Sequence, residues 1–246
     1  MRLAILSDIH GNREAFSAAL ADQAARGCDG VVILGDIVGY GPDPDWCCDK
    51  AMELAAAGAI VIRGNHDEAV TAGSAGMSSN ARIAIDWTRK RLSSAQAAFL
   101  AALPMSATRE AALFVHASAQ SPEDWIYVTN EATAAGSLRS CQTLVTFCGH
   151  VHVPALFSAD LRGQVAGIGV RFGMSYPLLR SRRWLAVVGS VGQPRDGCPQ
   201  ASYLIYDETA GEVCFRRVAY DCGAVATKIR AAGLPEALAQ RLICGE

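Results

Sequence analysis

The sequence carries almost no excess of charge, because its 22 Lys and Arg residues are balanced by 24 Asp and Glu residues, for a formal net charge of −2. Proteins that bind nucleic acid generally show a basic patch or stripe, so this composition argues against a general polyanion binder. The short basic segment Arg180–Arg183 is interpreted as solvated surface. No nucleic-acid partner is therefore expected.

Long apolar runs and paired cysteines are also missing. No segment approaches the ~18 consecutive apolar residues of a membrane-spanning helix. The first apolar segment, residues 3–6, is too short for the core of a signal peptide. The nine cysteines are odd in number and include no Cys-x-x-Cys pair, which indicates a reducing compartment rather than a disulfide framework. We expect a cytoplasmic protein without a membrane partner, and the composition leaves a homo-oligomer open.

Three common catalytic motifs do not occur in the chain. There is no G-x-x-x-x-G-K-[ST] phosphate loop, no G-x-S-x-G nucleophile turn and no properly spaced G-x-G-x-x-G dinucleotide loop. The chemistry must therefore be carried by other residues.

What the sequence does contain is an alternation of short apolar runs and helical patterns over its first 67 residues. The run at 31–34 has no polar residue and ends at Gly35 and Asp36, as expected for a strand buried on both faces of a parallel sheet. Further strands are predicted at 2–7 and 59–63, with helices at 13–26 and 45–57 between them. This β-α-β order predicts a parallel sheet with right-handed crossovers.

The pattern changes twice further along the chain. Residues 68–110 are predicted to be a mainly helical insertion, with one helical stretch at 81–103, after which strands return at 112–115 and 144–147. From residue 155 the runs become short and separated by turn residues, which predicts a second, more antiparallel sheet packed on the first. With 51% hydrophobic residues and no long linker, the chain is expected to form one domain over residues 1–246.

Polar side chains follow five of the predicted strands, at the point where each strand ends. These side chains include all five histidines of the chain, and they are Asp8, His10, Asp36, Asn65, His66, His116, His150 and His152. The ligand crevice of an open α/β sheet lies at the carboxyl ends of its strands, so we expect this set to converge. Carboxylate oxygen and imidazole nitrogen suit Mn, Fe, Zn or Ni, and the seven candidate ligands that remain when His66 is set apart exceed what one tetrahedral ion needs.

The order of these motifs resembles that of the calcineurin-like metallophosphoesterases, and of their small bacterial branch in particular. The shared motifs are D-x-H at 8–10, G-D at 35–36, G-N-H-D at 64–67, a lone His116 after a strand, and G-H-x-H at 149–152. The loop at 189–197 is similar to the late loop of that branch, although Val187-Val188 stands where Asn-Pro is usual. The resemblance implies an α/β fold of the two-sheet αββα sandwich type.

The resemblance also implies a role for each matched residue. Asp8, His10, Asp36 and His152 would form a first metal site, and Asp36, Asn65, His116 and His150 a second, with Asp36 shared. His66 would protonate the leaving group. The two divalent ions would be Mn by preference, with Fe, Zn or Ni as alternatives.

The expected activity is hydrolysis of phosphate esters, with small phosphodiesters or nucleotides as the expected substrates. Two divalent ions facing two carboxylates leave a local positive charge that attracts phosphate and acidifies a shared water. The resulting metal-bridging hydroxide would attack phosphorus in line. Asn12, Arg63 and Arg195 are candidate donors to the phosphate, Tyr40 is a candidate wall of the crevice, and Asp67 either orients His66 or caps a helix.

Two alternatives remain open from the sequence. A phosphomonoesterase or protein phosphatase would use the same fold, although residues 37–41 replace the D-R-G continuation of the eukaryotic Ser/Thr phosphatases. A non-catalytic binding scaffold is the alternative of another class, and it is disfavoured because a scaffold needs neither the full ligand set nor His66.

Overall fold

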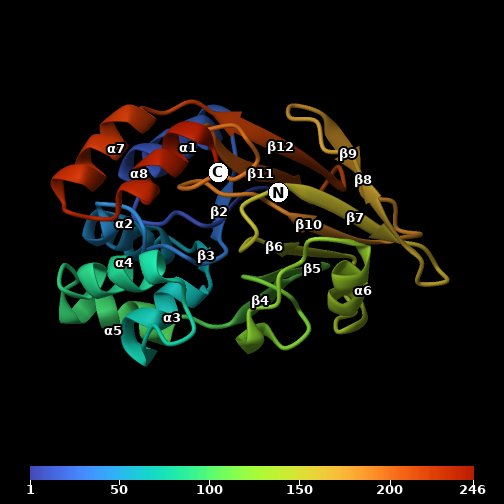
Figure 1. The fold of residues 1–246 in the computed structure, drawn as a ribbon. Helices are drawn as coiled ribbons and strands as arrows, with labels where there is room; N and C mark the ends of the chain where they lie inside the picture. Colours follow the sequence, from blue (N-terminus) through green and yellow to red (C-terminus); the bar gives the residue numbers. More distant parts are fainter.

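The computed structural model describes residues 1–246 and consists of two six-stranded sheets packed face to face, with helices outside them (Figure 1). The first sheet has the strand order β3-β2-β1-β11-β12-β9, and the second has the order β4-β5-β6-β10-β7-β8. The expected αββα sandwich is thereby confirmed. None of the helices is long and apolar enough to cross a bilayer.

The first sheet combines strands from both ends of the chain. Its strands are β1 (Arg2–Leu6), β2 (Gly30–Ile33), β3 (Ile60–Val61), β9 (Ser175–Pro177), β11 (Ala201–Asp207) and β12 (Glu212–Val218). The strands β1, β2 and β3 are parallel, as predicted. The hairpin β11–β12 then continues this sheet, because β11 runs antiparallel beside β1.

The second sheet is also mixed. Its strands are β4 (Ser106–Arg109), β5 (Ala112–Val115), β6 (Val145–Cys148), β7 (Ala155–Ala159), β8 (Val165–Ile168) and β10 (Arg183–Val187). Strand β6 pairs in parallel with both β5 and β10, whereas β10 pairs antiparallel with β7. Two packed sheets are found as predicted, but the prediction that the residues after 155 form the second, more antiparallel one is wrong. Their strands complete both sheets, because the parallel strands β1 and β6 each need a partner on their free edge.

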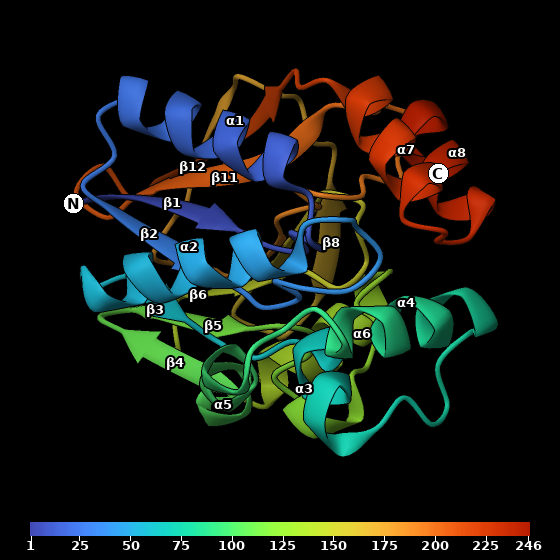
Figure 2. The ribbon, with the colours of Figure 1, turned by 90° about the vertical axis from the view of Figure 1, so that its left-hand side faces the viewer.

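Helices cover the outer faces of the sandwich. They are α1 (Arg13–Ala25), α2 (Pro44–Ala56), α3 (Asn65–Ala72), α4 (Ser79–Arg89), α5 (Ser94–Ala102), η1 (Pro122–Asp124), α6 (Glu131–Arg139), α7 (Cys222–Ala231) and α8 (Glu236–Cys244). Figure 2 shows α1 and α2 in front of the first sheet, with the α7–α8 hairpin beside α1. Helix α6 lies on the outer side of the second sheet (Figure 1).

The alternation of side chains along β1 explains why its sequence is apolar throughout. Leu3 and Ile5 belong to the core between the sheets, whereas Ala4 and Leu6 belong to the core beneath α1 and α2. Side chains of a strand alternate between its two faces, and both faces of this strand are covered. The carboxyl ends of the buried strands are thereby held at one edge of the sandwich.

The predicted helical stretch 81–103 is two helices, not one. It is interrupted at Ser93, whose hydroxyl accepts a hydrogen bond from the Gln96 backbone N–H, while the Gln96 side chain accepts one from the Ser93 N–H. This reciprocal pair is a capping box, which begins a new helix. The predicted insertion thus contains α3, α4 and α5, and it ends in β4, which pairs with β5 at an edge of the second sheet.

Candidate metal centre

The polar side chains that follow the buried strands converge at one edge of the sandwich. Three groups of their ligand atoms each lie within 4.8 Å of one another, namely Asp8–His10–His152, His10–Asp36–His66 and Asp36–His116–His150. All of these side chains are buried. The prediction that these residues come together is confirmed, because the strands β1, β2, β5 and β6 end side by side.

The backbone turns sharply at these strand ends. Asp8, His10, Asp36, His150 and His152 all have a positive φ, between 51° and 66°. Asp and His adopt this left-handed conformation more readily than most residues. The neighbouring glycines are needed for close approach, since a Cβ on Gly64 would overlap Asp36 and one on Gly149 would overlap Ser7 and Asp8.

Asp8, His10 and His152 form the first half of the centre together with Asp36. The Nδ1 atoms of His10 and His152 lie 3.2 Å from the Val38 oxygen and 2.6 Å from the Gln193 oxygen. A carbonyl only accepts, so each Nδ1 carries a hydrogen, and the Nε2 of each ring faces the centre. These two Nε2 atoms lie 3.2 Å apart, and that of His152 is 3.3 Å from Asp8 Oδ1.

His116, His150 and Asn65 form the second half, again with Asp36. The Nδ1 of His116 donates to the Leu34 oxygen at 2.7 Å, which directs its Nε2 toward the centre, at 3.2 Å from His150 Nδ1. The Oδ1 atom of Asn65 and the Nε2 atom of His150 are buried without any hydrogen-bond partner. An amide oxygen buried without a donor is costly in an isolated protein and is expected of a metal ligand.

Asp36 lies between the two halves. Its Oδ2 atom is 3.5 Å from His10 Nε2 and 3.5 Å from His116 Nε2, while its Oδ1 accepts a hydrogen bond from the His66 N–H at 2.8 Å. Ligand atoms at about 2.1 Å from a tetrahedral ion lie about 3.4 Å from one another. Lone pairs that face one another at this spacing repel unless a cation lies between them, so the donor set fits divalent metal ions.

In the metal-free protein, the carboxylates and the histidines of the centre shift one another's pKa values strongly. The pKa of Asp36 lies well below its ordinary value, because His116 and His66 outweigh the opposing effect of burial. Asp36 in turn outweighs burial at His116 and raises the pKa of that ring to about 9. Burial lowers the pKa of His150 to about 3 and that of His10 well below its ordinary value. Without a metal ion the centre thus combines ionised carboxylates, neutral His10 and His150 rings and a cationic His116 ring, which must release its Nε2 hydrogen when it binds a metal.

His66 is buried beside the centre but is held differently from the other histidines. Its ring lies 4.8 Å from that of His10 and 4.4 Å from that of Tyr40, between centroids, and its Nδ1 has no hydrogen-bond partner. Burial lowers its pKa to about 4, against the opposing effect of Asp36. The imidazole is therefore neutral in the free site.

Asp67 caps the turn that carries Asn65 and His66. Its carboxylate accepts hydrogen bonds from the backbone N–H groups of Ile37 and Val38 and, at 3.0 Å, from that of Gly64. These bonds tie the end of β2 to the start of α3. Of the two roles left open by the sequence, the observed contacts are those of the cap.

A cleft of about 510 Å³ opens over the second half of the centre. Asn65 and His150 lie at its base, and its walls come from the loop 73–78, α4, the segment 124–127 and α8. Tyr40 lines it, as the sequence suggested, and the ring of Tyr127 stacks on that of His150 with centroids 4.0 Å apart. This volume is within the range of small-molecule sites, roughly 300–1,000 Å³.

The three predicted phosphate donors lie in different surroundings. Arg195 lines the cleft, with its guanidinium 5.8 Å from the centroid of Tyr40. Asn12 is buried and caps α1, since its Oδ1 accepts from the Ala15 N–H. Arg63 donates to the carbonyls of Ala101 and Leu103, which links the end of β3 to the end of α5. Its guanidinium is therefore engaged away from the cleft.

Sequence reasoning did not identify Trp125, Tyr127 or Arg241 as cleft residues. Trp125 and Tyr127 follow a short 3-10 turn rather than a strand, and no motif marks them. Arg241 belongs to the C-terminal helix, whose sequence resembles an ordinary amphipathic surface helix. Only the packing of α7 and α8 against Tyr40 and α4 brings Arg241 to the cleft.

Comparison with known proteins gives one family and several similar structures. Residues 1–211 match the model of the calcineurin-like phosphoesterase superfamily domain. A metallophosphoesterase structure from Sphaerobacter thermophilus is 36% identical, covers 100% of this chain and 99% of its own, and superposes with a TM-score of 0.88. An uncharacterised protein of Methanocaldococcus jannaschii is 34% identical over 99% of this chain and 98% of its own. A hypothetical protein from Pyrococcus horikoshii has the same fold at 21% identity, with a TM-score of 0.80 over 100% of this chain and 98% of its own.

Proposed function

The chain belongs to the calcineurin-like phosphoesterase superfamily and is a metal-dependent hydrolase of phosphoester bonds, and from this premise we propose that it cleaves small phosphodiesters or nucleotides at a centre of two divalent ions. The observation that supports two ions is the position of Asp36 Oδ2, which is equidistant from a ligand nitrogen of each half. The Asp8, His10 and His152 side chains would complete one set and Asn65, His116 and His150 the other. Mn is the proposed metal, with Fe, Zn and Ni as alternatives.

When bound, such ions supply positive charge that binds phosphate and lowers the pKa of a water molecule. The chain's own residues would do the rest. Arg195 would donate to the phosphate from the wall of the cleft, where its Nε is buried without a partner. The buried position of the centre would hold water away from these charges and so strengthen their effect on the substrate.

His66 would deliver the proton that the leaving group needs. Its ring is next to Asp36 and His10, yet the ligand set is complete without it. Burial lowers the pKa of the ring, and the negative charge of a bound phosphate would act in the opposite direction. The proposal therefore places the protonation of His66 after substrate binding.

The direct test is to strip the protein of metal, reload it with one metal at a time and assay a panel of phosphate mono- and diesters. We expect about two ions per chain in fully active protein, and higher kcat/KM on diesters than on monoesters. One ion or fewer in fully active protein would reject the two-ion centre, and a preference for monoesters would reject the diester assignment. An absence of turnover with every metal and ester would reject the activity.

A further inference from the structure

The C-terminal hairpin of α7 and α8 is an addition to the matched family segment, which ends at residue 211. The hairpin is packed, not loose, because Val225, Ile229 and Leu238 are buried in a cluster with Tyr40 and Ala84. This cluster holds the hairpin on the side of α4, above it in Figure 2, and both α4 and α8 contribute residues to the lining of the cleft. An element outside the family segment thus forms part of the site.

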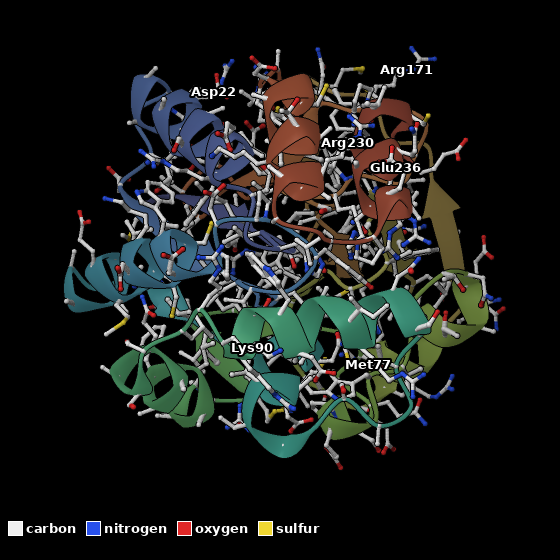
Figure 3. All side chains as sticks on the ribbon, turned by 60° about the vertical axis from the view of Figure 1, so that its left-hand side comes forward. Asp22, Met77, Lys90, Arg171, Arg230 and Glu236 are labelled. Carbon is white, nitrogen blue, oxygen red and sulfur yellow. The ribbon has the colours of Figure 1, made fainter.

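The basic side chains of this hairpin have different surroundings. Lys228 lies 2.6 Å from Glu14 and 2.9 Å from Asp43, and Arg230 lies 2.6 Å from Glu236. Figure 3 shows Arg230 and Glu236 together on the hairpin. Arg241, in contrast, makes no hydrogen bond or ion pair through its side chain, and it is half-buried in the wall of the cleft.

Arg241 shares that wall with Arg195 and Tyr40. All three side chains line the cleft, and the guanidinium of Arg195 lies 5.8 Å from the centroid of the Tyr40 ring. Arg195 is the inner of the two, because its backbone N–H donates to the His152 oxygen beside the metal ligands. Arg241 comes from an element that supplies no ligand.

The acidic residues of the cleft do not neutralise this wall. Glu68 lies 3.7 Å from Arg63, on the side of β3, and Asp124 is on the segment that carries Trp125 and Tyr127. Neither forms an ion pair with Arg195 or Arg241. A guanidinium without a partner in a concave site is suited to bind phosphate or carboxylate through two parallel hydrogen bonds.

We propose that Arg241 forms a second anion-binding subsite, so that the preferred substrate carries another phosphate group in addition to the one that is cleaved. This proposal rests on the proposed function for the identity of the cleaved bond. Arg195 binds the phosphate at the metal centre, and Arg241 binds the additional phosphate further along the same wall. The substrate class is then a nucleotide with two phosphate groups. The rings of Trp125 and Tyr127 line the same cleft and would pack against its base.

The test compares two esters that differ by one phosphate and share their leaving group. They are thymidine 5′-(p-nitrophenyl phosphate) and the same ester with a 3′-phosphate. Wild-type protein should show the higher kcat/KM on the 3′-phosphorylated ester, by about 10- to 100-fold, the effect of a charge-assisted bond. Arg241→Gln should reduce this ratio to near one, whereas the matched control Arg230→Gln on the same hairpin should keep it.

A binding measurement makes the result independent of turnover. Thymidine 3′,5′-bisphosphate and thymidine 5′-monophosphate are titrated into the metal-loaded protein, and the bisphosphate should bind about 10-fold or more tightly in the wild type but not in Arg241→Gln. Failure of all hydrolysis with this binding difference intact would reject the proposed function and keep the subsite. Equal ratios in the wild type and Arg241→Gln, or equal binding of the two nucleotides, would overturn the subsite.

Discussion

The two halves of the proposed metal centre differ in how firmly their candidate ligands are held. In the first half, His10 and His152 each donate the Nδ1 hydrogen to a backbone carbonyl, so the direction of each ring is fixed. In the second half only His116 has such a bond, while His150 Nε2 and Asn65 Oδ1 have no partner. His150 is held instead by stacking on Tyr127, which is 52% exposed at the cleft.

This difference assigns different tasks to the two halves. A hydrogen bond that orients a ligand histidine typically improves metal affinity by about 10- to 100-fold. The first half should therefore bind its ion tightly, whereas the second half, at the base of the cleft, should bind its ion more weakly and lie closer to the substrate. The proposed centre would then have one half with rigidly held ligands and one half that faces the cleft.

The largest expected effect comes from Asp36, which we propose as the ligand common to both halves. Asp36→Asn removes the shared negative charge, so both ions should be lost or loosened together. The loss of several kcal/mol of transition-state stabilisation corresponds to a fall in kcat/KM of about 10⁴-fold or more. Metal content and kinetics measure this, with Asp160→Asn as a control carboxylate remote from the centre. Retention of one tightly bound ion would show that Asp36 serves one half alone.

The next effect concerns His66, which we place in neither half. His66→Gln should slow hydrolysis of alkyl or nucleoside esters by about 100-fold or more, since an alkoxide leaving group needs a proton. Nitrophenyl esters, whose leaving group departs readily without a proton, should lose far less, and both ions should remain. If the variant instead loses an ion, His66 is a ligand and the boundary between the halves must be redrawn.

A smaller effect separates the halves directly. Titration of the loaded protein with a chelator should release the ions in two steps, with affinities that differ by about 10- to 100-fold. His150→Ala should bind one ion where the wild type binds two, with the tighter of the two affinities. Simultaneous release of both ions in the wild type would remove the distinction between a rigid half and a half that faces the cleft.

The smallest expected effect is at Arg63, which supports the end of β3 that delivers Asn65. Arg63→Gln removes hydrogen bonds to Ala101 and Leu103, and the free energy of unfolding should fall by about 1 kcal/mol. This corresponds to a fall in Tm of roughly 2–4 °C in a chain of this size. Arg195→Gln is the converse variant, which should lower kcat/KM and leave Tm unchanged. A fall in kcat/KM as large in Arg63→Gln as in Arg195→Gln would restore Arg63 as a phosphate donor.

The convergence of the ligand residues could be predicted from sequence because it depends on local rules. Each residue directly follows a buried apolar strand, and parallel strands bring their carboxyl ends to one edge. The mixing of early and late strands within each sheet could not be predicted in this way. The run at 201–207 is apolar enough to be buried on both faces, but nothing in its local pattern states that its neighbour is β1, 200 residues earlier.

The walls of the cleft were harder to predict for the same reason. Arg195 was found because it lies in a loop that resembles a family motif, whereas Arg241 reaches the cleft only through helix packing over long sequence distances. Arg63 illustrates the converse. It precedes the ligand motif directly, yet its long side chain turns toward the carbonyl groups that end α5.

At five candidate ligand positions, the backbone conformation that the site uses lowers the stability of the fold. These residues have a positive φ, and they are Asp8, His10, Asp36, His150 and His152. Each of these non-glycine residues costs roughly 1–2 kcal/mol of backbone strain that glycine would relieve. A substitution that relieves this strain also removes a side chain proposed to bind the metal. Laboratory evolution of this enzyme toward stability must therefore select for turnover at every round.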